Sequence, residues 1–244
     1  MLQNRTTQAR NQGMTTATII DTPGGSADAD PPEVDEQFAH WDYKRGLHPF
    51  ARVLLALAAI ALATLFTVPI WRIDLKAPQY PEGLVITISH DHFAGDIQKI
   101  NGLNHYIGMA TIEDNMFPEF AIMRYAFYLL ISWGVIAAII GKRSALFSWL
   151  FALFAFVIWA MWDMYAWGYK YGHNLDPHAA IQVEGMAYQP PLLGHKKLLN
   201  FDAWSTPDQG GWVLFGVITV AVLLYLHDHW VHHRAKKKLK IANP

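Results

Sequence analysis

The chain of 244 residues contains no cysteine. This absence excludes disulfides, zinc sites with cysteine ligands, cysteine-held iron–sulfur clusters and a covalently attached c-type haem, which needs a Cys-x-x-Cys-His motif. A metal ion in this protein would therefore need histidine, methionine, carboxylate or backbone oxygen ligands.

Charged residues are scarce as well, at 16% of the chain, whereas a soluble domain carries about 25%. Hydrophobic residues reach 52%, and the formal net charge of −1 gives no basic excess of the kind that nucleic-acid binding requires. No phosphate-binding loop, dinucleotide fingerprint, Ser-His-Asp set or His-Glu-x-x-His motif occurs. The composition predicts a small membrane protein that contacts lipids, is not an enzyme and binds no nucleic acid.

Long hydrophobic stretches occur four times, at about 50–70, 120–141, 145–168 and 211–227. A helix rises about 1.5 Å per residue, so each stretch is long enough to cross the ~30 Å hydrocarbon core of a bilayer. We therefore predict an all-α integral membrane protein with four transmembrane helices.

Basic residues predict the orientation of these helices. They flank the first stretch, fill the turn between the second and third, and follow the fourth: Lys44, Arg45, Arg52, Lys142, Arg143 and Lys236–Lys240. Lys and Arg accumulate on the cytoplasmic side of membrane proteins. Both termini are therefore predicted to be cytoplasmic and loops 71–118 and 169–210 extracytoplasmic, in a multi-pass protein of the inner (cytoplasmic) membrane.

The segments outside the helices differ in character. Residues 1–40 are polar and contain Pro and Gly clusters, so we expect a flexible cytoplasmic tail before a membrane domain over 41–244. In the first loop, the β-branched run 84–88 predicts a short strand, and residues 96–106 predict a short helix. The two loops together are expected to form a small irregular extracytoplasmic cap.

The loops also carry side chains that suit copper. These are His90, His92, His105, Met109, His173, His178 and Met186. On a helix, His105 and Met109 would share one face, and an imidazole with a soft thioether suits Cu(I). Two hypotheses stay open: the residues converge on an extracytoplasmic copper site, or they form only the hydrogen bonds that hold the loops.

Three further features carry polar chemistry near the membrane. Asp163 lies near the outer end of the third stretch, where a carboxylate is costly unless it is paired or reaches water. Arg124 is its expected counter-ion, and a proton or quinol-headgroup site at Asp163 is the alternative. Behind the fourth stretch, the spacing of His229, His232 and His233 fits a metal-binding helix face, but a basic tail with Lys236, Lys237 and Lys238 favours anionic lipid headgroups.

Three strings in the loops are distinctive: APQYPEGL (77–84), INGLNHYIGM (100–109) and GHNLDPH (172–178). They resemble a family of small bacterial four-helix membrane proteins associated with gene clusters for nitrous oxide reductase and other copper enzymes. The resemblance implies an accessory role in copper delivery or electron supply, with His105, Met109, His173 and Met186 as the natural ligands.

Two hypotheses of function follow from the sequence. The first is a non-catalytic accessory protein that handles copper outside the cytoplasm or docks a copper-dependent respiratory enzyme. The second is a structural subunit of a larger membrane complex for electron transfer or photosynthesis. In that case the loops, the aromatic third helix and the N-terminal tail are contact surfaces for protein partners.

Overall fold

Four helices dominate the computed structural model, which describes residues 46–198 and 200–242; the predicted tail 1–40 lies outside the described residues. The four are α2 (Pro49–Ala61) with its 3-10 continuation η1 (Leu62–Phe66), α4 (Glu119–Ile140), α5 (Arg143–His173) and α6 (Gln209–Ala242). Each is long and apolar enough to cross a membrane, α6 over Gln209–Ala235. The helix predicted to end near 227 therefore continues through the histidine cluster and into the basic tail.

Small residues bring the helices close together. A Cβ atom at Gly134 of α4 would collide with Ala59 of α2 and with Trp149 of α5. Trp149 is fully buried and donates from Nε1 to the carbonyl of Leu130 at 2.8 Å. Glycine at a helix contact lets the backbones approach, which is how helices associate where lipid provides no hydrophobic drive.

The prediction of an all-α fold is wrong, because the two loops form a five-stranded antiparallel sheet. Its strands are β1 (Trp71–Ala77), β2 (Tyr80–Ile88), β3 (Phe93–Gly95), β4 (Gly194–Leu198) and β5 (Phe201–Pro207), in the order β3-β2-β1-β5-β4. The single strand predicted at 84–88 is the second half of β2. The helix expected at 96–106 is α3 (Ile97–Ile107), and a short 3-10 turn, η2 (Asp114–Met116), precedes α4.

Backbone pairing between β1 and β5 joins the first loop to the second. The register sets Trp71 opposite Pro207 and Lys76 opposite Asp202. Next to this pairing, Trp71 donates from Nε1 to the hydroxyl of Ser205 at 2.7 Å, and Ser205 is fully buried. The cap is therefore one sheet shared by both loops, and both loops emerge at the same end of the helices.

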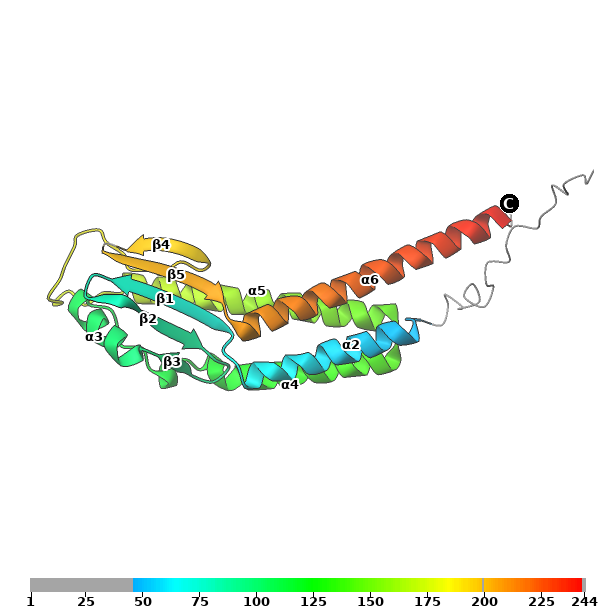
Figure 1. Ribbon diagram of the computed structural model, residues 1–244, viewed down its shortest axis with the longest axis horizontal. Coiled ribbons are helices and arrows are strands. Elements are labelled where there is room, and N and C mark those ends of the chain that lie inside the picture. Colours follow the sequence, from blue (N-terminus) through cyan, green and yellow to red (C-terminus); the bar gives the residue numbers. More distant parts are fainter. Residues whose placement is uncertain (1–45, 199, 243–244) are drawn as a thin grey trace, which may run out of the picture. The chain divides into compact units, whose positions relative to one another are not determined.

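One face of the sheet packs against the helices (Figure 1). Its buried side chains include Trp71 and Ile73 of β1 and Leu84 and Ile86 of β2, and methionines of α5 pack against them. A second, larger core lies among the helices themselves, around Leu55, Phe127, Trp149 and Ala221. The sheet and the helices thus meet along an apolar layer.

The β1–β5 register predicts which pair of introduced cysteines can form a disulfide between the two loops. Arg72 and Thr206 are exposed and lie directly opposite each other. Opposed Cα atoms of antiparallel strands lie about 4.5–5.5 Å apart, inside the range that a disulfide spans. In the Arg72→Cys/Thr206→Cys variant, mild oxidation should protect both thiols from a maleimide reagent.

The matched control is Lys76→Cys with Thr206→Cys, which uses the same two strands but lies four residues out of register, since Lys76 faces Asp202. Its thiols should stay reactive. Equal protection of both pairs, or of neither, would contradict the pairing.

Candidate functional site

A cavity of about 310 Å³ lies in the apolar layer between the sheet and the helices. The sheet contributes Trp71, Ile73 and Ile86 to its wall, and α4 and α5 contribute Met123 and Met161. The β1 and β2 side chains reach the cavity because alternate residues of a strand point to the same face. The result is a partly open, mostly apolar space of the size that small-molecule sites have.

Only a few polar side chains line this cavity. They are Ser89, Asn104, Glu119, Asp163, Tyr171 and Tyr188. The Oε2 atom of Glu119 and the hydroxyl of Tyr188 are buried, and neither has a hydrogen-bond partner among the described residues. Asn104 is buried at the end of α3, and its side-chain amide donates to the carbonyl of Ala110 at 3.4 Å.

Aromatic rings gather beside these polar groups, at the C-terminal half of α5. The Phe117 ring lies 4.6 Å from Trp167 and 4.7 Å from Phe93, centre to centre, and it stacks on Tyr171 at 6.0 Å. All four rings line the cavity. One end of the cavity is therefore walled by flat π-faces.

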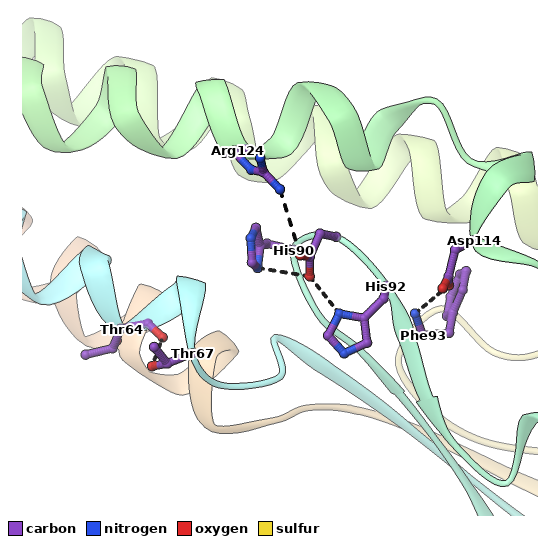
Figure 2. Close-up of polar contacts among 8 residues, drawn as sticks. Thr64, Thr67, His90, His92, Phe93, Asp114 and Arg124 are labelled. Carbon is purple, nitrogen blue, oxygen red and sulfur yellow. Dashed lines mark hydrogen bonds and ion pairs between the residues drawn. The ribbon is translucent and has the colours of Figure 1, made fainter.

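A separate polar cluster lies at the turn between β2 and β3, where Asp91 contacts His90, His92 and Arg124; Figure 2 shows these three side chains. Its Oδ1 lies 2.7 Å from Nδ1 of His92 and 3.4 Å from Nδ1 of His90, and its Oδ2 lies 4.0 Å from Arg124 of α4. His90 is buried, with its ring edge-on to Phe66 at 5.2 Å. The cluster ties the sheet to η1 and α4.

The same contacts shift the acidity of Asp91. The hydrogen bond from His92 lowers the pKa of the Asp91 carboxyl, and the charges of His90, His92 and Arg124 lower it further, against a smaller opposing effect of burial. A carboxyl whose pKa is lower in the folded than in the unfolded state stabilises the fold at neutral pH, and this contribution is lost in acid.

Arg124 therefore takes a different partner from the one expected. It lies beside Asp91, and among the described residues it forms no ion pair with Asp163. Asp163 instead lines the cavity within electrostatic reach of Glu119. Glu119 is the first residue of α4 and Asp163 belongs to α5. The packing of α4 against α5 therefore brings the two carboxylates within electrostatic reach of each other.

The predicted copper ligands are spread over the cap. His105 is on α3 and exposed, but α3 ends at Ile107 and Gly108 follows in the left-handed conformation, with φ 79°. Met109 therefore lies beyond the helix, so the two side chains do not share a helix face. Glycine permits this positive φ without steric cost. Met109 faces the cavity.

The other candidates lie elsewhere on the cap. His173 ends α5 with its ring stacked on Tyr169 at 3.9 Å, His178 is exposed, and Met186 is half-buried. His90 and His92 belong to the Asp91 cluster. No three His, Asp or Glu side chains within residues 46–198 and 200–242 lie close enough together to hold one metal ion.

Two of the predicted ligand segments nevertheless meet at a seam, which we define as the contact of the segment 105–109 with the segment 176–181. The backbone of Asp176 donates to the carbonyl of Gly108 at 2.8 Å, and that of Ile181 donates to Tyr106 at 2.9 Å. A Cβ atom at Gly108 would collide with Asp176 and Ala179. His105 and Met109 are thus held next to the segment that carries His178.

At the far end of α6, the predicted lipid-binding lysines continue the helix, and Lys237 is exposed. Asp228 pairs there with Arg143 of α5, at 2.5 Å between Oδ2 and Nε. The His229 and His233 rings lie 4.6 Å apart, as expected for residues four apart on one helix.

Comparison with known proteins gave no relative: no family model, curated protein or solved structure matches the chain. The resemblance to proteins of nitrous oxide reductase gene clusters therefore stays a prediction.

The sequence analysis missed three residues that the fold makes prominent: Asp91, Glu119 and Tyr188. Asp91 lies between the two histidines that drew attention, and Glu119 is the only acidic residue in the stretch 117–140. Both were available signals. Tyr188 gave none, because only its burial distinguishes it from the other tyrosines that the structure describes.

Removal of the Asp91 carboxylate should lower the stability of the folded protein near neutral pH but not in acid. Because the folded pKa is lowered, the contribution of Asp91 is full above the unfolded value of about 3.9 and declines as the pH falls through the folded value. Asp91→Asn should lower the melting temperature by about 1–3 °C at pH 5 and above, as expected for a partly exposed ion pair. The difference from the wild type should shrink as the pH is lowered towards 3.

Melting curves in detergent at several pH values measure the difference in melting temperature between Asp91→Asn and the wild type. Glu184→Gln, which neutralises an exposed carboxylate of the second loop, is the control and should change the melting temperature little. A loss for Asp91→Asn that persists unchanged at pH 3 would show that the effect is not electrostatic.

Proposed function

We propose that the chain is a non-catalytic accessory protein of the cytoplasmic membrane that binds a lipid-soluble molecule between its extracytoplasmic sheet and its helices. The observation that carries this proposal is the cavity of about 310 Å³, apolar along its walls with a few polar side chains. Ligand sites have this volume range and this composition. The four apolar helices support a place in the membrane.

The position of the cavity also favours a ligand that dissolves in lipid. Its walls come from α4, α5 and the start of α6 as well as from the sheet. These helices expose large apolar side chains such as Ile122, Phe151 and Leu223 on their outer sides, which suits contact with acyl chains. A molecule that partitions into the bilayer is concentrated where the cavity lies.

Filling the cavity should weaken ligand binding. Met161 of α5 lines the cavity, so Met161→Trp should reduce its free volume and weaken binding of 4-decylphenol, a lipid-soluble probe, by about tenfold or more. Native mass spectrometry of the protein released from lipid nanodiscs that contain the probe measures occupancy. Ile158→Trp is the control, since Ile158 lies on the same helix but is 68% exposed.

The control should bind as the wild type does. Equal occupancy in Met161→Trp and the wild type, or no saturable binding in either, would refute the proposal.

The seam supports copper handling as a second candidate function. There an imidazole and a thioether, from His105 and Met109, are held beside the segment that carries His178. Both ligand types suit Cu(I), and rotation of the exposed His105 and His178 side chains costs little compared with movement of a paired backbone. Docking of a copper enzyme at the same surface is the related role that the sequence analysis favours.

Copper handling predicts that the seam residues act together. His105→Ala with Met109→Ala should weaken Cu(I) affinity by about tenfold or more, as measured by competition with a chromogenic Cu(I) chelator. His195→Ala is the control, because His195 lies away from the seam on β4 and is held by Asp202 at 2.8 Å. An unchanged affinity in the double variant would exclude the seam as a copper site.

A further inference from the structure

Two buried polar atoms at the cavity have no partner, and this points to the chemistry of the missing ligand. Tyr188 is only 3% exposed, yet its hydroxyl forms no hydrogen bond within the described residues. The same holds for Oε2 of Glu119. Nearly all buried polar groups in native proteins are paired, so each exception needs an explanation. A molecule bound in the cavity would supply hydrogen-bond partners for both atoms, and it would also account for the unfilled space.

The charged side chains around the cavity are both acids. Glu119 and Asp163 both line it, whereas no Lys, Arg or His of the described residues does. A carboxylate in an apolar space is costly unless a donor or a cation approaches it. No cation of the described residues lines the cavity to pair with these carboxylates, so a ligand that brings a donor or a positive charge would satisfy them.

The polar groups lie at the end of the cavity that has the aromatic rings. The backbone of Tyr188 donates to Gly172 of α5 at 2.9 Å, which fixes residue 188 beside the last turns of that helix. Phe117, two residues before Glu119, packs on Trp167 and Tyr171 of the same turns. Flat π-faces next to carboxylates suit an aromatic hydroxyl group or an ammonium group.

Resting on the proposed function, we infer that the cavity binds an amphiphile with its apolar body along the sheet and a hydrogen-bond-donating head at Glu119 and Tyr188. Two kinds of molecule in a membrane have this chemistry, a lipid-soluble phenol and a lipid with an ammonium headgroup. Both present donors to acceptors, and both carry an apolar chain.

Matched probes test the donor directly. 4-Decylphenol and 4-decylanisole have the same chain and ring, but the methyl ether has no donor. Decylammonium and decyltrimethylammonium differ in the same way, since only the first has N–H groups. At least one donor-bearing probe should bind about tenfold more tightly than its blocked partner, which is the effect of one charge-assisted hydrogen bond. The pair that discriminates identifies the head as phenolic or ammonium.

Tyr188→Phe separates binding from folding. Removing an unpartnered hydroxyl should leave the melting temperature of the ligand-free protein unchanged or raise it, because a buried polar group is lost without breaking a hydrogen bond. The same variant should weaken binding of the preferred probe by about fivefold. Glu119→Gln should weaken it too. Tyr106→Phe, at an exposed position of α3, should change neither quantity.

The outcomes distinguish this inference from the proposed function. If both members of each pair bind equally and Met161→Trp blocks them, the cavity is a ligand site but the donor head is refuted. If no probe binds saturably, both are refuted. A fall in the melting temperature of Tyr188→Phe would also overturn the inference, because it would mean that the hydroxyl is already paired.

Discussion

The structure depends on the backbone pairing of β1 with β5. These strands belong to different loops, and the buried bond between Trp71 and Ser205 spans 134 residues of sequence. Backbone N–H and C=O groups must be paired when they leave water, and two loops that emerge at the same end of a helix group can satisfy each other by sharing a sheet. That sharing turns two connections into one surface with an apolar face.

The cavity follows from how that face meets the helices. The sheet is held at its β2–β3 turn by Asp91 against α4, and at its other side by the continuation of β5 into α6. Between these attachments the Trp71, Ile73 and Ile86 side chains face Met123 and Met161 across a space that they do not fill. Residues of both loops and of α4, α5 and α6 line it, so a ligand there would contact both loops and three of the four long helices at once. The seam at the C-terminal end of α3 adds a further connection between the loops, and Met109 belongs to both the seam and the cavity wall.

The fold was only partly open to sequence reasoning. The alternation of Trp71, Ile73 and Leu75 with Arg72, Asp74 and Lys76 is a strand pattern that could have been recognised. In β5 the inward residues are Ala203 and Ser205, which do not look like a buried strand face, and β4 is short and exposed. The site was less predictable still. Asp163 was identified, but its neighbour Glu119, the unpaired hydroxyl of Tyr188 and the true partner of Arg124 depend on contacts between distant segments.

The sequence by itself determined the four apolar helices and the shared end at which both loops emerge, because crossing a hydrocarbon layer requires a fixed length of apolar residues whatever their neighbours are. Only the tertiary structure decided that the loops form one sheet, that Met109 faces the cavity, and that two carboxylates line one apolar space. Strand register, burial and hydrogen-bond satisfaction depend on pairs of residues. The sequence around one residue does not show which distant residue will pair with it.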